Sequence, residues 1–324
     1  MKIKNVLVTG GAGYIGSHTC KALAANGYQP VVLDNLIYGH EDAVRWGPLI
    51  KGDIADATLL DQVFTDYAIE LVLHFAAYAY VGESVIDPEK YYQNNVVGTL
   101  SLLSAMRRSN VNKIVFSSTC ATYGNPAKLP ITEDTAQNPI NPYGYTKLVV
   151  ENIFKDYQRA YGLNWCALRY FNAAGCDPSG DLGERHDPET HAIPLAIAAA
   201  LGTGGAFKVM GTDYETHDGS AIRDYIHVSD LADAHVKAAQ YLIRGGQSCA
   251  LNLATGRGTS VKEILAAVEV ATGRTVPYEN VPRREGDPAS LYAQATLAKE
   301  KLGWLPKFVE INETVKTATN WFCK

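Results

Sequence analysis

The feature that most constrains the fold is a glycine pattern that directly follows a short apolar run near the start of the chain. Residues 6–8 form that run, and Gly10, Gly13 and Gly16 follow it with the spacing G-x-x-G-x-x-G. Glycines at this spacing permit a tight turn, let backbone amides approach a pyrophosphate and let a helix pack closely on a strand. The helix N-terminus then offers N–H donors and a partial positive charge to the anion. The pattern therefore predicts a dinucleotide site in a strand–loop–helix unit.

Short apolar runs alternate with segments of helical periodicity through the first half of the chain. Strands are predicted at 6–8, 31–33, 71–74, 114–116 and 166–168, and helices at 14–26, 57–66, 90–108 and 143–160. Continuous apolar strands separated by helices are typical of a parallel sheet that is covered on both faces. We therefore expect an α/β fold built on a Rossmann-type, doubly wound parallel sheet.

The pattern changes after Arg169, which suggests a second unit. Residues 172–190 are predicted to form a long loop, followed by helices at 192–201, 229–243, 260–271 and 310–321 and by strands near 207–210 and 222–228. A loop of this length in a compact domain is usually functional. We predict an NAD-binding domain over 1–172 and a smaller α/β substrate-binding lobe over 173–324. Segments such as 222–243 could return to the first domain.

Composition limits the classes of ligand. The formal net charge of the 324 residues is −5, so the chain has no overall attraction for nucleic acid or anionic membranes. An anionic substrate must therefore be held by a few placed Arg or Lys side chains.

Cysteine usage and hydropathy bear on metals and location. The 6 cysteines are scattered without a C-x-x-C pair, which is typical of reduced, buried thiols, and no zinc-type ligand spacing is found. No signal peptide and no apolar run long enough for a spanning helix are recognised. These observations predict a cytoplasmic protein without a bound metal.

Acidic and small residues follow the later strands. Asp34 ends the second strand, where a carboxylate accepts hydrogen bonds from an adenosine ribose and repels a 2′-phosphate, and no Arg or Lys follows before Arg45. This favours NAD over NADP. Asp53 is predicted to end a further, third strand and Phe75-Ala76-Ala77 the fourth, and the ends of neighbouring parallel strands converge on one crevice.

A candidate catalytic pair lies further along. Tyr143 and Lys147 form Y-x-x-x-K, a weak pattern by itself, but Asn141-Pro142 precedes it as a predicted N-cap and first helical residue. Tyr and Lys then share a helix face one turn apart. A phenol titrates near 10, and a nearby ammonium together with a positive nicotinamide would favour its ionised form. The fifth strand ends in Ser117-Ser118-Thr119, which brings hydroxyls to the same place.

Several motifs point to a family. They are Thr9-Gly10-Gly11-Ala12-Gly13-Tyr14-Ile15-Gly16, Val81-Gly82-Glu83-Ser84, Tyr91-Tyr92-Gln93-Asn94-Asn95, the Ser-Ser-Thr strand end, Tyr-x-x-x-Lys, Arg169-Tyr170-Phe171-Asn172, Arg223-Asp224-Tyr225-Ile226-His227-Val228 and Arg283-Arg284-Glu285-Gly286-Asp287. Together they resemble the extended short-chain dehydrogenase/reductase superfamily and, within it, the UDP-hexose 4-epimerases. The resemblance covers nearly the whole chain.

The resemblance implies roles for individual residues. Tyr143 would be the catalytic base, Lys147 would bind the nicotinamide ribose and lower the pKa of the tyrosine, and Thr119 would be the third catalytic residue. The residues expected to contact NAD are Gly10, Gly13, Tyr14, Ile15, Gly16, Asp34, Asn35, Asp53, Ile54, Phe75, Ala76, Ala77, Asn94, Ser117, Tyr143, Lys147 and Tyr170. Those expected to contact the UDP-sugar are Thr119, Tyr143, Asn172, His191, Lys208, Arg223, Arg284, Asp287 and Leu291.

The implied reaction is epimerisation at C4 of a UDP-hexose, UDP-glucose or UDP-galactose. NAD would take hydride from C4, a 4-keto sugar would turn over, and the same hydride would return to the opposite face. Family members are commonly homodimers, which this resemblance implies here as well.

Other readings stay open. UDP-N-acetylhexosamines or UDP-xylose and UDP-arabinose are alternative substrates, since Leu291 is intermediate in size at the position expected to limit the sugar pocket. A dehydratase is disfavoured because Cys120-Ala121 follow Thr119 where an Asp-Glu pair is expected. A non-catalytic NAD-binding regulatory protein on the same fold is the alternative of a different class.

Overall fold

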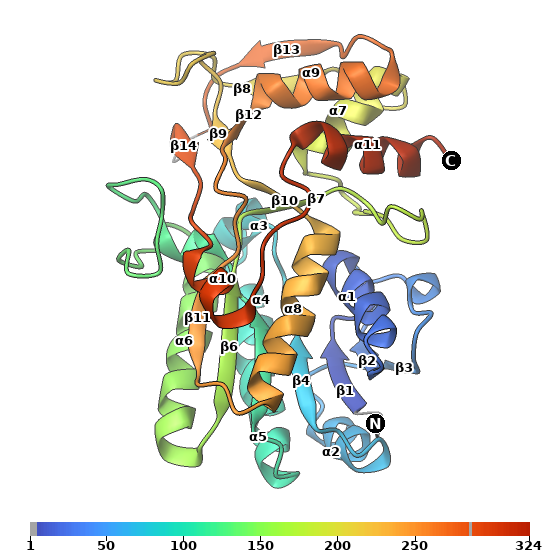
Figure 1. The fold of residues 1–324 in the computed structure, drawn as a ribbon, viewed down its shortest axis with the longest axis vertical. Coiled ribbons are helices and arrows are strands. Elements are labelled where there is room, and N and C mark those ends of the chain that lie inside the picture. The colour runs from blue at the N-terminus through green and yellow to red at the C-terminus, as the bar shows by residue number, and fades with distance from the viewer. Residues whose placement is uncertain (1–4, 285–286) are drawn as a thin grey trace.

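The structure, a computed structural model, describes residues 5–284 and 287–324. Its centre is a seven-stranded sheet in the order β11-β6-β5-β4-β1-β2-β3, with every neighbouring pair parallel (Figure 1). The strands are β1 (Asn5–Thr9), β2 (Gln29–Asp34), β3 (Leu49–Lys51), β4 (Leu71–His74), β5 (Lys113–Ser117), β6 (Asn164–Arg169) and β11 (Cys249–Asn252). The predicted Rossmann-type α/β fold is confirmed.

Both faces of the sheet are buried because successive side chains of a strand point to opposite sides. Val6 and Val8 face a core that is closed by α1 (Tyr14–Ala25), α8 (Val228–Ile243) and α10 (Thr296–Leu302). Leu7 faces the opposite core, which is closed by α2 (Ala57–Asp66), α5 (Gly98–Arg108) and α6 (Pro142–Tyr161). Continuous apolar strands are the sequence signature of this arrangement.

A smaller lobe lies beyond the carboxyl ends of the sheet strands, at the top of Figure 1. Helices α7 (Ala192–Leu201), α9 (Val261–Thr272) and α11 (Ile311–Phe322) share a core with β8 (Phe207–Met210), and β8 pairs with β13 (Tyr278–Val281). Two further small sheets join the lobe to the rest of the molecule. They consist of β12 (Thr259–Ser260), β9 (Ile222–Arg223) and β14 (Ser290–Leu291), and of β10 (Tyr225–His227) with β7 (Asn172–Ala174).

The predicted helix over 90–108 is interrupted. It consists of α4 (Pro88–Tyr91), a π-helical segment (Tyr92–Val97) and α5. Asn95, inside the π segment, is buried, and its side chain bonds the backbone of Tyr78 and the hydroxyl of Thr146. Single π turns of this kind are frequent at functional sites.

Other short elements also differ from the predictions. The predicted loop over 172–190 begins with β7, and the third strand ends at Lys51, two residues before Asp53. Strand β11 and the short helices were not predicted, namely α3 (Val81–Ile86), α10 and the 3-10 turns Glu41–Ala43 and Cys120–Tyr123.

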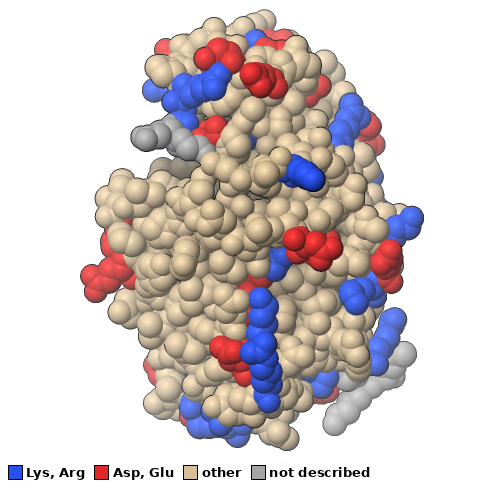
Figure 2. Space-filling model, turned by 90° about the vertical axis from the view of Figure 1, so that its left-hand side faces the viewer, with Lys and Arg blue, Asp and Glu red and all other residues tan. Residues whose placement is uncertain are grey.

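The surface carries mixed charge. On the face shown in Figure 2, Lys and Arg are interspersed with Asp and Glu across a largely uncharged surface. Within the two described ranges, no helix combines the length and the apolar character needed to cross a bilayer.

Candidate active site

The glycine loop between β1 and α1 has little room for side chains. A Cβ on Gly16 would lie 2.2 Å from the Gly10 carbonyl oxygen, and one on Gly10 would lie 2.6 Å from the Ala76 nitrogen. At Gly13 the nearest atom to such a Cβ would be 3.4 Å away. Gly13 is the N-cap residue of α1, and no side-chain hydrogen bond caps that helix among the described residues. The loop thus packs against β4 and leaves the N–H groups of the α1 first turn for a ligand.

Asp34, at the end of β2, is tied to this loop. Its carboxylate accepts the backbone N–H groups of Ala12 at 3.0 Å and Leu36 at 2.9 Å. Burial raises the pKa of Asp34, and these amides and His40 oppose that shift. Further along the same edge, the Asn35 amide donates to the Asp53 carboxylate at 3.0 Å. These three predicted cofactor residues therefore lie together.

The end of β4 forms the other wall of the loop. The backbone N–H groups of Phe75 and Ala76 both donate to the Thr9 carbonyl, at 2.9 and 3.0 Å. Ala77 follows them directly. Two further predicted cofactor residues lie away from this loop. Ile54 is buried beneath Gly98 of α5, and the Asn94 amide donates to the Asn95 side chain at 2.9 Å.

The Tyr–Lys pair lies on α6, which begins as predicted. The Asn141 side chain accepts the Gly144 N–H at 2.8 Å, with Pro142 as the first helical residue. The Lys147 ammonium donates to the Ser117 carbonyl at the end of β5 at 2.8 Å and lies 5.9 Å from the Tyr143 ring centre. The structure thus brings the predicted pair to the end of β5.

Hydroxyl groups surround the pair. The Thr119 side chain lies close enough to Tyr143 to act on the pKa of its phenol, and the Thr119 hydroxyl accepts the Ala121 N–H at 3.1 Å. Ser117 and Tyr170 share a hydrogen bond between their side-chain oxygens. All the predicted residues around the reacting end therefore meet at the ends of β5 and β6.

Burial dominates the titration of the pair in the protein without cofactor. Burial raises the pKa of Tyr143 to about 12, and the hydrogen bond with Thr119 only partly opposes it. Burial also lowers the pKa of Lys147 to about 7, against the attraction of Glu151. In the protein alone burial therefore dominates the pKa of Tyr143, so the ionised tyrosine needs positive charge nearby.

A buried ion pair that the sequence analysis did not single out supports this helix. Glu151, one turn after Lys147, accepts Arg169 Nε at 3.0 Å and pairs with Arg169 Nη2 at 2.5 Å. The Glu151 side chain has no exposed surface and that of Arg169 is 5% exposed. Glu151 also accepts the Ser118 hydroxyl at 2.6 Å. The sequence signal that could have identified Glu151 is its position one helical turn after Lys147, which places both residues on one face of the helix.

Four of the predicted substrate residues lie together at the small lobe. Arg284 makes two hydrogen bonds to the Asp287 carboxylate, at 3.1 and 3.0 Å, and Arg223 Nη2 lies 3.6 Å from the same group. Leu291 of β14 pairs in register with Arg223 of β9. Of the predicted Arg-Arg-Glu-Gly-Asp motif, Glu285 and Gly286 lie outside the described residues.

Two other predicted substrate residues lie on different strands. The Asn172 backbone and side chain donate to the Asp224 carbonyl at 3.3 and 3.4 Å, which places Asn172 beside the Arg223 strand. Lys208 is exposed on β8 and lies 3.9 Å from Glu279 of the neighbouring strand. The roles of both residues toward a substrate stay predictions.

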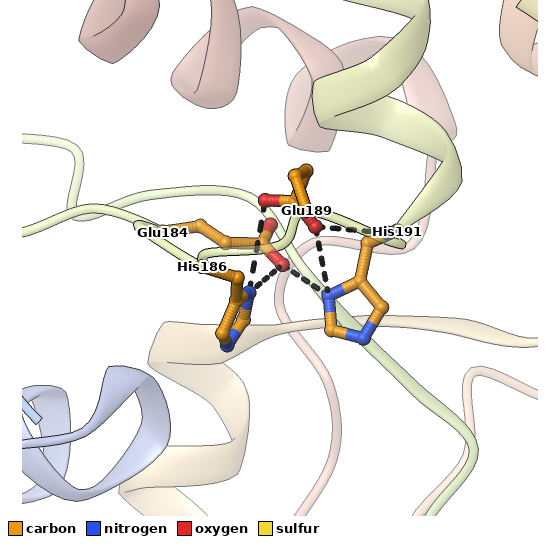
Figure 3. Close-up of side chains that lie close together, drawn as sticks. All are labelled: Glu184, His186, Glu189 and His191. Atoms are coloured by element: carbon orange, nitrogen blue, oxygen red, sulfur yellow. Dashed lines mark hydrogen bonds and ion pairs between the residues drawn. The ribbon is translucent and has the colours of Figure 1, made fainter. Parts of the chain in front are cut away.

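His191 lies in a cluster that sequence reasoning missed. Its Nδ1 atom contacts the buried Glu184 carboxylate and is 3.9 Å from Glu189, and His186 joins the same group (Figure 3). Burial alone would lower the pKa of His186, but the carboxylates of Glu184 and Glu189 raise it to about 9. The sequence signal that could have identified this cluster is the pattern Glu-x-His, which occurs twice in the loop.

A parallel sheet with a glycine loop after its first strand and a Tyr–Lys helix beside its fifth defines a dinucleotide-binding protein of the Rossmann type. The family is more specific. The chain belongs to the NAD dependent epimerase/dehydratase family, whose sequence profile matches residues 6–254.

Full-length relatives agree with that family. A UDP-glucose 4-epimerase of Rhizobium leguminosarum bv. trifolii is 55% identical over 321 residues, covering 99% of this chain and 98% of the relative. The crystal structure of UDP-glucose 4-epimerase from Brucella ovis in complex with NAD has a TM-score of 0.96 and 56% identity, with 98% of each chain covered. The enzyme from Bifidobacterium longum in complex with NAD+ and UDP has a TM-score of 0.93 and 39% identity, covering 99% of this chain and 98% of that one.

Proposed function

We propose that this chain interconverts UDP-glucose and UDP-galactose by NAD-dependent epimerisation at C4. The observation that carries the proposal is the meeting of Tyr143, Thr119 and Lys147 at the end of β5 in a chain so similar to NAD-bound UDP-glucose 4-epimerases. A regulatory protein that only binds NAD would have no need of this set of groups.

The residues present fit NAD. The crowded Gly10 and Gly16 and the open Gly13 shape a loop for a pyrophosphate, and the carboxylates of Asp34 and Asp53 suit an adenosine. When bound, NAD supplies a hydride acceptor and a positive ring charge. Tyr14, Ile15, Asn35, Phe75, Ala77, Asn94, Ser117 and Tyr170 are proposed as further contacts.

Tyr143 would move the proton. With its pKa lowered by added positive charge, its phenolate takes the proton of the C4 hydroxyl as hydride leaves C4, and it returns that proton when hydride comes back. Thr119, whose side chain acts on the pKa of Tyr143, would hold the tyrosine oxygen through a hydrogen bond. Lys147 is held by Ser117 and contributes charge in its protonated form.

The nucleotide end would be held by guanidinium groups. In the free protein Arg223 and Arg284 lie beside the Asp287 carboxylate. On substrate binding the two guanidinium groups would leave this carboxylate and bind the diphosphate through paired hydrogen bonds. Asp287 is then free for the uridine ribose. We propose Asn172, His191 and Lys208 as further contacts and Leu291 as the residue that limits the sugar pocket.

The organisation around the reaction is proposed as well. Residues 1–172 would hold the cofactor and residues 173–324 the UDP-sugar, although α8 and β11 pack with the first part. A homodimer is supported by exposed apolar side chains close to α6, such as Val85 and Ile86 of α3 and Val97. The free thiols are consistent with a cytoplasmic location.

The test measures conversion of UDP-galactose to UDP-glucose through a coupled UDP-glucose dehydrogenase. We expect the purified protein to carry NAD and to turn over without consuming added NAD. Tyr143→Phe should lower kcat by about 10²–10⁴-fold, the usual contribution of a positioned acid–base group. Tyr145→Phe, on the exposed side of the same helix, should leave it unchanged.

Two results would remove the proposal. One is full activity of the Tyr143→Phe variant, and the other is steady consumption of NAD during turnover. A panel of UDP-sugars followed by NMR decides the substrate, and equal rates of the wild type and Leu291→Tyr on plain and N-acetylated sugars would exclude Leu291 as the limiting residue.

A further inference from the structure

The loop between β7 and α7 carries two Glu-x-His pairs that fold onto one another. Glu184 and His186 form the first pair, and Glu189 and His191 form the second. Figure 3 shows that both carboxylates and both Nδ1 atoms point to a common centre, while the Nε2 atoms point away. One ligand atom from each of the four residues lies within 4.8 Å of every other.

The separations suit a small cation. His186 Nδ1 is 3.2 Å from Glu184 Oε1 and 3.7 Å from Glu189 Oε2, and His191 Nδ1 is 3.9 Å from Glu189 Oε1. A tetrahedral ion with bonds of about 2.0–2.2 Å needs its ligand atoms roughly 3.3–3.6 Å apart. These three separations lie within about 0.3 Å of that range, whereas His191 Nδ1 and Glu184 Oε1 are in closer contact and would move apart around an ion.

Burial gives an independent reason to expect a ligand. Glu184 is 1% exposed, and both Nδ1 atoms face the same oxygen of its carboxylate. His186 Nδ1 is buried and, within the described part of the chain, makes no hydrogen bond of good geometry, although the Glu184 and Glu189 carboxylates lie 3.2 and 3.7 Å away. A buried carboxylate needs positive charge beside it, and a cation at the centre of the cluster would supply that charge.

We propose that Glu184, His186, Glu189 and His191 bind a divalent transition-metal ion, with Zn²⁺ as the expected occupant. Two imidazole nitrogens and two carboxylate oxygens belong to the ligand types that Zn²⁺ uses, and four protein ligands complete its tetrahedral shell. Such a closed shell leaves no position for substrate, so the site is structural. It replaces the expectation of a protein without metal.

The metal would fix a loop that covers the cofactor loop. Tyr14 directly follows Gly13, and its hydroxyl donates to the Gly175 carbonyl. The centres of the Tyr14 and His186 rings are 5.9 Å apart in an edge-on arrangement. On the other side, His40 Nε2 lies 3.0 Å from the Arg185 carbonyl oxygen and the Tyr80 hydroxyl donates to the Pro188 carbonyl at 3.2 Å. An ion at the cluster therefore stiffens the segment that rests on the start of α1.

The test is metal stoichiometry on the full chain, purified without a histidine tag. The protein is treated with EDTA, equilibrated with Zn²⁺, desalted and measured by elemental mass spectrometry. We expect about one zinc per chain and an upward shift of Tm with added Zn²⁺, since an ion that binds only the folded state stabilises it. Equilibration with Co²⁺ should give the visible absorption typical of tetrahedral coordination.

Variants locate the ion. His186→Gln and Glu189→Gln should each lose the stoichiometric zinc and the Tm shift, so a folding failure of one leaves the other to decide. His217→Gln is the matched control, because His217 also lies beside two carboxylates, at 3.7 and 3.5 Å, but is exposed. Cys249→Ser controls for the thiol pair, in which Cys166 and Cys249 sulfurs are 3.9 Å apart. Substoichiometric zinc in the wild type, or zinc retained in both loop variants, would overturn the proposal whatever the enzyme activity.

Discussion

At the scale of the residue, Asp224 is a buried carboxylate at the junction between the two lobes, and its ionised form is destabilised by burial. The side chain has no exposed surface, and its Oδ1 accepts the Thr255 N–H at 3.1 Å and the Thr255 hydroxyl at 2.6 Å. Its backbone N–H donates to Leu291, and its carbonyl accepts from Asn172, so both flanking strands depend on it. Burial raises the pKa of Asp224 to about 6 in spite of these hydrogen bonds.

This shift predicts a pH dependence of stability with a definite sign. Between pH 4 and 6 the folded state keeps a proton on Asp224 that the unfolded state has lost, so the contribution of this group to stability falls as the pH rises. The unfolding free energy of Asp224→Asn, relative to that of the wild type, should therefore rise by roughly 2–3 kcal/mol between pH 4 and pH 7. Above pH 7 this difference should stay constant.

Urea unfolding at a series of pH values measures this difference, and the exposed Asp66→Asn should follow the wild type throughout. A difference that does not change with pH would show that the carboxylate of Asp224 ionises as easily in the folded state as in the unfolded state.

At the scale of the element, the glycine loop separates packing from ligand binding. A Cβ on Gly16 would meet the Gly10 carbonyl oxygen at 2.2 Å, whereas Gly13 has room for one. We predict that Gly16→Ala lowers Tm and NAD binding together. Gly13→Ala should keep the Tm of the NAD-free protein but weaken NAD binding by more than tenfold, because its methyl group would stand where the backbone approaches a pyrophosphate.

Thermal unfolding of NAD-stripped samples and a fluorescence titration with NAD decide between these outcomes. Unchanged NAD affinity in Gly13→Ala would mean that the open side of the loop does not face the cofactor.

Helix α6 gives a second prediction for an element. Removing the charge of Glu151 leaves the buried Arg169 guanidinium without a counter-ion, so Glu151→Gln should lower the unfolding free energy by about 3–5 kcal/mol. Asp156→Asn, which removes an exposed partner of Arg159 on the same helix, should cost about 0–1 kcal/mol. Equal costs in urea unfolding would contradict the argument from burial.

The sequence predicts an element well when residues within or next to that element determine its structure. The helix over 57–66 and the strand over 71–74 match the structure residue for residue, since periodicity and flanking residues define them. The π segment around Asn95 was not predictable, because side-chain bonds to Tyr78 and Thr146 from distant parts of the chain hold it.

The same reasoning applies to the site. Glycine, Tyr–Lys and hydroxyl positions were predicted because each follows a strand or begins a helix. The approach of Arg223 to Asp287 depends on the pairing of β9 with β14, and the His186 cluster depends on how a long loop folds back on itself. Neither contact has a periodic signal in the sequence.

At the scale of the whole molecule, the chain returns from the small lobe to complete the large sheet. Strand β11 adds to the edge at β6, and α8 covers the sheet face beside α1. Leu231, Leu242 and Leu251 from this return are fully buried in the same core as Val8. The first 172 residues therefore hold the predicted cofactor contacts but only part of the core beneath them.

We predict that residues 1–172 expressed alone do not fold cooperatively. Without α8 and β11, the part of one sheet face that α1 does not cover and the edge of β6 would be exposed to water, and exposed sheet edges and apolar faces promote aggregation. A fragment of residues 1–256 restores both elements but lacks Trp304, whose indole is buried and donates to the Asp230 carbonyl at 3.0 Å. It should unfold more sharply than the 1–172 fragment and less sharply than the full chain in urea followed by circular dichroism. A sharp transition and NAD binding in the 1–172 fragment would instead show that the cofactor half of the molecule is an independent folding unit, with α8 and β11 as dispensable additions.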